Sequence, residues 1–167
     1  GVASGSVTFT KSDATPFNAN WVDETGSNVS NGGNRISFQL GPGQTRKFKA
    51  VGDLPLTVGY AKVEANAAVL GTAMFAHLGG GAQILAEAGV PMAIPLGKQA
   101  IFVDTTSGFR TGVAIGNPNN ASLDIQLELL DRNGQRIALT VRTLKPFEHV
   151  ALFTDELFPG TTEVVGR

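Results

Sequence analysis

The sequence predicts an all-β fold, an antiparallel β-sandwich, and three observations carry this prediction. Charged side chains make up only 16% of the 167 residues, while 21 glycines and 8 prolines supply turns, a balance that favours short strands over surface helices. Apolar and polar residues alternate over many short stretches, which is the period of a strand with one buried face. Two such stretches flank the turn signal Asn133-Gly134.

Residues 123–144 carry the clearest structural signal in the sequence, which predicts a β-hairpin. Each strand has its large apolar residues on one face: Leu123, Ile125, Leu127 and Leu129 in the first, Ile137, Leu139 and Val141 in the second. A two-residue loop would place Leu139 opposite Glu128 and turn the second apolar face away from the core. A three-residue loop, residues 132–134, with Gly134 in the left-handed conformation of a bulge, pairs Leu127 with Leu139 instead. We therefore expect these two leucines to share one core.

The other elements are predicted in chain order from the same alternation. A first strand covers residues 6–10, and the polar stretch at residues 18–34 is predicted to be a loop or a flap around Trp21. Strands at residues 56–63 and 66–78 are apolar on both faces, which is typical of central strands covered on both sides. Residues 83–88 fit a strand or a helical turn, and residues 154–159 fit a helical turn ended by proline. Further strands are predicted at residues 36–40, 45–51, 100–104, 110–116 and 149–153. The predicted core contains Phe38, Phe48, Leu127, Leu139, Val141 and Phe153.

One unit occurs twice when the chain is aligned with itself. At one constant offset of 104 residues, Leu40-x-Pro42 matches Leu144-x-Pro146 and Leu54-Pro55 matches Phe158-Pro159. The strand motif Val7-x-Phe9 matches Ile125-x-Leu127 at an offset of 118, which makes the stretch around Trp21 an insertion in the first copy. The first copy lacks a counterpart of residues 111–117, and the second ends where the first continues, so the repeats are cyclically cut. We expect units at residues 1–90 and 91–167, packed as in an immunoglobulin-like or jelly-roll-like sandwich, as two domains or one continuous domain.

Three motifs carry a family resemblance. Residues 111–118 (Thr-Gly-Val-Ala-Ile-x-Asn-Pro), the turn Asp131-x-Asn133-Gly134 and residues 151–159 (Ala-Leu-Phe-x-Asp-Glu-Leu-Phe-Pro) resemble a module repeated in long secreted and surface proteins of soil bacteria. The likeness covers most of the chain after Ile36. It implies an extracellular or cell-surface β-sandwich whose molecular function is largely undescribed.

Composition argues against several classes of chemistry. With 13 basic and 14 acidic side chains the net charge is -1, so the sequence lacks the excess of positive charge that nucleic-acid binding needs. No apolar run is long enough to span a membrane. The absence of Cys removes disulfides and thiolate sites. His77 and His149 have no partner at ligand spacing, and no nucleophile elbow or phosphate loop occurs, so both histidines are expected to be structural. We expect no enzyme, no cofactor and no metal.

The remaining reading is a non-catalytic extracellular protein with a structural or adhesive role. The missing counterpart of residues 111–117 predicts an unpaired sheet edge in the first unit, which an extended segment of a neighbouring molecule would cover. Terminal strands are the natural donors, through Val2, Val7, Phe9 and Val164. Because a head-to-tail contact propagates, the expected assembly is a homo-oligomer or filament of this chain. The other reading of the missing strand is that the chain has been trimmed from a longer one.

Two further functions stay open. Trp21 and Phe109 lie in Gly-rich loops and, with Tyr60, would form an aromatic platform for a surface glycan, as in a carbohydrate-binding module of a secreted protein. An accessory domain of a secreted enzyme is the third reading. Asn28 and Asn120 lie in glycosylation sequons, which matter only in a host that modifies them.

Overall fold

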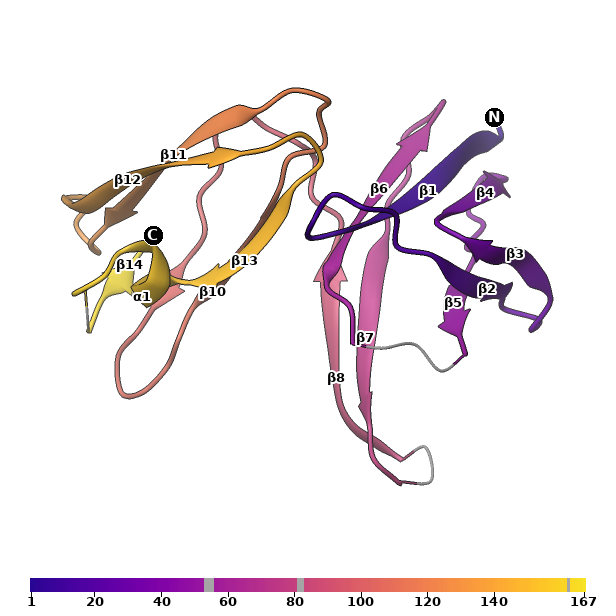
Figure 1. Ribbon diagram of the computed structural model, residues 1–167, viewed down its shortest axis with the longest axis horizontal. Coiled ribbons are helices and arrows are strands. Elements are labelled where there is room, and N and C mark those ends of the chain that lie inside the picture. The colour runs from indigo at the N-terminus through magenta and orange to yellow at the C-terminus, as the bar shows by residue number, and fades with distance from the viewer. Residues whose placement is uncertain (53–55, 81–82, 162) are drawn as a thin grey trace.

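The computed structural model describes residues 1–52, 56–80, 83–161 and 163–167. Within these ranges the protein is all-β with antiparallel sheets, as the sequence predicts, and its one helix, α1 (Thr154–Leu157), is a single turn. Figure 1 shows a first lobe containing β1 to β6, a second lobe containing β9 to β14, and a separate hairpin, β7–β8, beside the first lobe. No helix in the described part of the chain is long and apolar enough to cross a membrane.

The first lobe is built from two three-stranded sheets. In one sheet β1 (Ala3–Lys11) lies between β4 (Arg35–Leu40) and β6 (Gly59–Ala65); in the other β2 (Ala19–Asp23) lies between β3 (Asn28–Gly33) and β5 (Phe48–Val51). Their inward side chains form an aromatic core: buried Ala19, Trp21 and Ile36, with Phe9, Phe17, Phe48 and Ala50 packed against them. Apolar residues from both sheets therefore meet as in a sandwich.

The polar stretch around Trp21 is an ordered hairpin, and the prediction of a loop or flap was wrong. Ala19 and Trp21 face inward in β2 and are 3% and 6% exposed, while Asn20 between them is exposed. Two inward residues suffice to anchor a strand when one is a tryptophan, because an aromatic ring buries a large area. β2 also pairs with β5 from Asn20–Val51 to Asp23–Phe48.

The second lobe contains three two-stranded sheets. They are β10 (Gly112–Gly116) with β13 (His149–Phe153), β11 (Leu123–Leu130) with β12 (Arg136–Leu144), and β9 (Val103–Asp104) with β14 (Val165–Gly166). Its core contains buried Val103, Leu129, Phe158 and Val164, with Leu127, Ala138 and Leu157 packed against them. The match between Leu54-Pro55 and Phe158-Pro159 lies partly outside the described residues.

The turn of the β11–β12 hairpin follows the sequence prediction. The Gly134 N–H donates to the Asp131 carbonyl at 3.0 Å, and the Asp131 N–H donates to the Gln135 carbonyl at 2.9 Å. These bonds close a three-residue loop over residues 132–134. Gly134 has a φ of 80°, which confirms the predicted left-handed conformation.

The register beyond this turn was predicted wrongly. Leu130 pairs with Arg136, but Leu129 pairs with Ala138, so Ile137 is an extra residue in a bulge. A shift of one residue exchanges the two faces of a strand. Leu127 consequently lies opposite Thr140, and Leu139 lies opposite Glu128 on the outer face.

The predicted core is correct for half of its members. Phe38 is buried, and Phe48 and Leu127 pack half-buried against the two cores. Leu139 and Val141 are 48% and 62% exposed because of the bulge, and Phe153 is 38% exposed. The Phe153 ring instead lies 3.8 Å from the Arg110 guanidinium, a cation–π contact at the surface.

Candidate assembly surface

The β7–β8 hairpin is the largest departure from expectation. β7 (Thr72–Leu78) and β8 (Ile84–Pro91) pair only with each other, and every residue in both strands is exposed. The sequence predicts a central strand at residues 66–78, which includes β7, and a strand or a helical turn at residues 83–88, at the start of β8, but no other described strand pairs with either one. Figure 1 shows the two strands running away from the sheets of the first lobe.

Large apolar side chains are concentrated on this hairpin and on the segment that follows it. Nine of them are each more than half exposed: Met74, Phe75, Leu78, Ile84, Leu85, Val90, Ile94, Leu96 and Phe102. We call these nine residues the hairpin surface. Glu87 and His77 are the only titratable side chains in the two strands. Sequence reasoning identified the apolar character of the hairpin but assigned it to burial.

Three of the four residues predicted to donate strands are held in the chain's own cores. Val7 and Phe9 lie in β1, whose two edges pair with β4 and β6, and the Phe9 ring stacks on Trp21 with centroids 4.0 Å apart. Val164 is 7% exposed, whereas Val2 is 56% exposed. Exchange of the N-terminal strand would therefore require β1 to leave its sheet.

The sheet edge expected to be open in the first lobe is occupied. β5 pairs with β2, so the stretch predicted to be an insertion supplies a strand beside β5. In the second lobe β10 pairs with β13 in the same antiparallel sense. The expected acceptor groove beside β5 is thus filled from within the chain.

The aromatic platform predicted for a glycan does not form. Trp21 is 6% exposed and its indole N–H donates to the Gly33 carbonyl at 3.0 Å. Phe109 is 67% exposed in the second lobe, and Tyr60 lies at the junction of the lobes. A sugar ring needs an open aromatic face, and Trp21 offers none.

His149 lies at the junction between the lobes. Its Nδ1 is 3.0 Å from the Ser12 hydroxyl, and its backbone N–H donates to the Ser12 carbonyl at 3.3 Å. The His149 ring stacks on the Tyr60 ring, with 6.0 Å between the ring centroids. The Tyr60 hydroxyl donates to the Asn117 carbonyl at 3.4 Å. Burial lowers the pKa of His149. The Ser12 hydroxyl and the His149 ring nitrogen resemble the nucleophile and the base of a catalytic triad. No carboxylate, which would be the third group, is seen bonded to this ring among the described residues.

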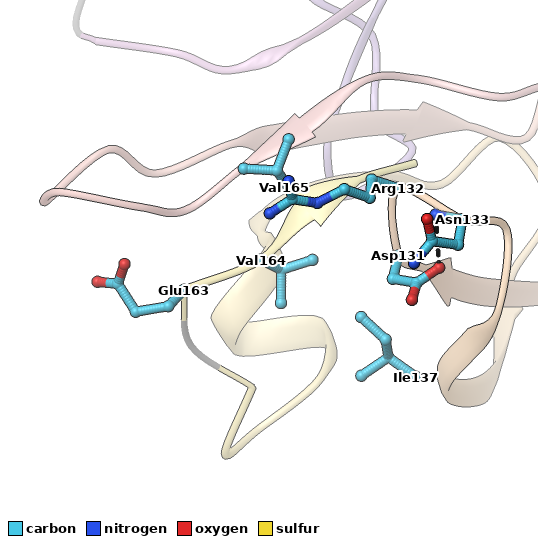
Figure 2. Close-up of a pocket in the computed structure, with 7 residues that line it drawn as sticks. All are labelled: Asp131, Arg132, Asn133, Ile137, Glu163, Val164 and Val165. Carbon is cyan, nitrogen blue, oxygen red and sulfur yellow. Dashed lines mark hydrogen bonds between the residues drawn. The ribbon is translucent and has the colours of Figure 1, made fainter.

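A pocket of about 370 Å³ lies beside the β11–β12 turn (Figure 2). Charged lining residues are Asp131, Arg132 and Glu163, and apolar ones include Ile137 and Val164. One Asp131 carboxylate oxygen accepts the N–H groups of Asn133 and Gln135, each at 2.8 Å. This carboxylate therefore holds the turn, and the described lining residues include no hydroxyl, thiol or imidazole nucleophile.

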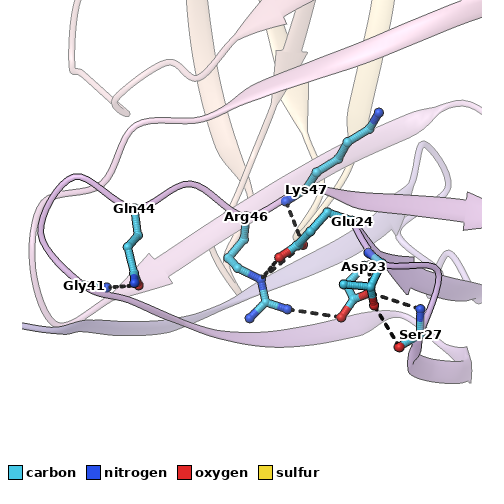
Figure 3. A network of polar contacts seen from close by, with 8 residues as sticks. Asp23, Glu24, Ser27, Gly41, Gln44, Arg46 and Lys47 are labelled. Carbon is cyan, nitrogen blue, oxygen red and sulfur yellow. Dashed lines mark hydrogen bonds and ion pairs between the residues drawn. The ribbon is translucent and has the colours of Figure 1, made fainter.

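A polar network joins the β2–β3 turn to the chain before β5 (Figure 3). The Arg46 guanidinium lies 3.4 Å from Asp23 and 3.0 Å from Glu24. The Thr25 hydroxyl donates to Asp23 at 2.6 Å, and this bond, with further N–H donors and Arg46, lowers the pKa of Asp23. Both carboxylates are thus paired anions, which suits a structural role better than proton transfer.

Comparison of the chain with family models, with curated proteins and with solved structures finds no match.

Proposed function

We propose that this chain is a non-catalytic structural or adhesive β-sandwich protein that works outside the cell or on its surface, and that the hairpin surface is its contact site. The observation that carries the proposal is that every residue of β7 and β8 is exposed. The sandwich in the first lobe provides a scaffold whose own core is filled, so the hairpin is free to contact another molecule.

Physical chemistry supports a partner for this hairpin. An isolated two-stranded hairpin is marginally stable in water, and three or more strands or a packing layer are needed to hold it. Contiguous exposed apolar surface beyond a few hundred Å² marks an interaction site in soluble proteins. The hairpin surface is apolar and uncovered, so binding would both bury it and stabilise the two strands.

The proposed origin is a duplication with cyclically cut repeats. In the first lobe β1 pairs with β4 on one side and β6 on the other. In the second lobe β11 pairs with β12, and its end exchanges backbone hydrogen bonds with Arg167. The pairing of β5 with β2 and of β13 with β10 supports the same correspondence. A repeat of this kind fits a scaffold, because extra copies extend a structure without adding chemistry.

Adsorption to defined surfaces tests the proposed contact site. Purified protein would be passed over alkyl-coated and glycan-coated sensor chips, beside a Phe75→Lys variant and a Val141→Lys control that also changes an exposed apolar residue. We expect retention on the alkyl surface that Phe75→Lys abolishes and Val141→Lys keeps. Equal retention of all three proteins would refute the assignment of the contact site, and retention on glycan that depends on Phe109 would support a carbohydrate-binding module instead.

Location is a separate part of the proposal and has its own measurement. Antibody labelling of intact, unpermeabilised cells that express the protein should detect it at the surface or in the medium. Labelling that requires permeabilisation would contradict an extracellular role.

A further inference from the structure

Strand pairing in the second lobe resembles pairing in the first, but one edge of β11 is left open. In the first lobe β1 lies between β4 and β6. The motif Val7-x-Phe9 of β1 matches Ile125-x-Leu127 of β11, and β12 pairs with β11 antiparallel as β4 pairs with β1. No described strand pairs with residues 123–129 on the side away from β12. We call this side the open edge of β11.

Hydrogen bonds at the end of β11 mark the place where β6 begins in the first lobe. The Ser12 N–H, just after β1, donates to the Val58 carbonyl at 2.9 Å, and β6 begins at the next residue. The Leu130 N–H, at the end of β11, donates to the Arg167 carbonyl at 2.7 Å. Ser12 and Leu130 have the same offset of 118 residues as the two strand motifs. Arg167 therefore stands beside β11 as Val58 stands beside β1.

Backbone polar groups are available along the open edge. In an antiparallel strand the N–H and C=O groups of successive residues point to alternate edges. Leu130 bonds to Arg167 and not to β12, so Glu128, Gln126 and Asp124 present their backbone groups to the same side as Leu130. None of these three residues has a backbone bond to a residue outside the β11–β12 pair in the described part of the chain. A row of unpaired groups of this kind is a template for a further strand.

We infer that the open edge of β11 binds an extended strand of a partner protein, in the position that β6 has beside β1. The bound strand enters beside Arg167 and runs antiparallel to β11 toward Leu123. Main-chain hydrogen bonds supply the affinity in strand addition, and alternate side chains supply the specificity. A third strand also stabilises a sheet that otherwise has two. This site is separate from the hairpin surface and does not depend on it.

The inner face of the bound strand is expected to have small or β-branched apolar residues. In β6, Ala61 and Val63 lie opposite the Val7-x-Phe9 motif of β1. The matching Ile125-x-Leu127 motif of β11 has its two apolar side chains half-buried. A strand with an alanine and a valine at the same two positions would cover both side chains. Burial of apolar surface then adds to the main-chain bonds.

The outer face of the bound strand is expected to be basic. Asp124 and Glu128 are exposed on the outer face of β11, on either side of Gln126. In the register of β6, Lys62 would lie opposite Gln126, between the two carboxylates, and Glu64 would lie opposite Asp124. Like charges that are directly opposed across two strands are destabilising. The partner strand is therefore one that alternates small apolar residues with basic ones.

A synthetic peptide of residues 59–65 with Glu64→Lys is the probe for the open edge. Added in excess to the isotope-labelled whole chain, it should slow amide hydrogen exchange about tenfold at Asp124, Gln126 and Glu128, as measured by NMR. The same peptide without the lysine should bind roughly two- to fivefold more weakly. A peptide that also carries Val63→Asp should not bind, because the charge would face the apolar core.

Two contrary results would overturn the inference. One is an unchanged exchange rate along β11 in a large excess of the lysine peptide. The other is slower exchange along β1 and not along β11, which would show that the peptide replaces β6 in the first lobe.

Two matched proline variants locate the bound strand on one edge of the hairpin. Gln126 and Val141 are directly opposed, so their N–H groups point to opposite edges of the β11–β12 pair. A proline is tolerated where the N–H faces an open edge, so both variants should keep the fold. Gln126→Pro should lose peptide binding, because it removes a donor from the open edge of β11, and Val141→Pro should keep it. Equal binding by both folded variants would refute the assigned edge, and the wild-type titration decides the question if either variant unfolds.

Discussion

The two lobes fill their cores by different means. In the first lobe, the rings of Phe9 and Trp21 stack between two three-stranded sheets. The described part of the second lobe has two-stranded sheets and a mainly aliphatic core with one aromatic ring, Phe158, and it buries a polar residue, Asn117, completely. A lobe with complete sheets can rely on apolar burial, whereas a lobe with short sheets needs hydrogen bonds to hold its connections.

Asn117 shows how the second lobe compensates. Its side-chain amide donates to the carbonyls of Ala121 and Lys145 at 2.8 and 2.9 Å, and its carbonyl accepts the Asn119 N–H at 3.1 Å. These bonds tie the end of β10 to the end of β12. The comparison implies that the first lobe is most sensitive to loss of volume and the second to loss of hydrogen bonds.

The largest effect is expected at Trp21. Trp21→Ala should reduce the free energy of unfolding by about 3–5 kcal/mol, because it leaves a cavity between the two sheets of the first lobe. Chemical denaturation followed by far-UV circular dichroism measures this loss. Phe109→Ala, at a residue 67% exposed, is the control and should change stability by less than about 0.5 kcal/mol. Similar losses in both variants would show that Trp21 does not organise the first lobe.

The next effect is expected at Asn117. Asn117→Ala should cost about 2–3 kcal/mol, because it takes the side-chain donor from the part-buried Ala121 carbonyl and one of the two donors from the Lys145 carbonyl. Hydrogen exchange would locate the loss, and faster exchange should be confined to the second lobe. Asn119→Ala leaves the donors of Asn117 in place and should cost less. Faster hydrogen exchange across the first lobe would contradict the proposal that the second lobe is the one most sensitive to loss of hydrogen bonds.

A pH-dependent effect is expected at the junction that joins the lobes. Burial lowers the pKa of His149 in the folded state below its ordinary value of 6.5, so the unfolded chain takes up the proton more readily. The stabilisation that this residue contributes is therefore complete above pH 6.5 and is lost as the pH falls from 6.5 toward the folded-state pKa. His149→Gln lacks this titration.

Thermal unfolding of both proteins between pH 8 and pH 5 measures this difference. Titrations shared by the two proteins cancel in the comparison, leaving the contribution of His149. We expect the stability of the wild type to fall relative to His149→Gln as the pH drops below the ordinary histidine pKa. Parallel curves would show that the junction does not respond to this proton.

The sequence predicted the strands and the turn of the β11–β12 hairpin but not the bulge at Ile137. A bulge adds one residue to the ladder and leaves the alternation of the strand unchanged, so Ile137 carries no signal that it is the extra residue. Volume explains the result, because Ala138 packs in a core already occupied by Leu129 and Phe158. A leucine in the place of Ala138 would not fit beside them.

The exposure of the β7–β8 hairpin was missed for a related reason. Apolar residues on both faces of β7 predict burial, and a single sequence does not reveal whether the covering layer comes from the same molecule or from another. Trp21 was misjudged in the opposite direction, since its neighbour Asn20 is polar and exposed while the ring is buried. In both segments the local pattern of apolar and polar residues was interpreted correctly, but the packing of the segment against the rest of the molecule was not.

The smallest effect is expected on the outer face of β12, and it tests the bulge directly. Leu139→Thr should change the free energy of unfolding by less than about 0.5 kcal/mol, because Leu139 is 48% exposed and faces away from the core. Its neighbour gives the matched contrast: Ala138→Leu should cost about 1–3 kcal/mol by overpacking the second lobe. If β12 had the register without a bulge, Leu139 would face Leu127 in the core and the ranking of the two variants would reverse. Denaturation midpoints of the two variants therefore decide which residues of β12 face inward, and a costly Leu139→Thr with a neutral Ala138→Leu would restore the pairing of Leu127 with Leu139.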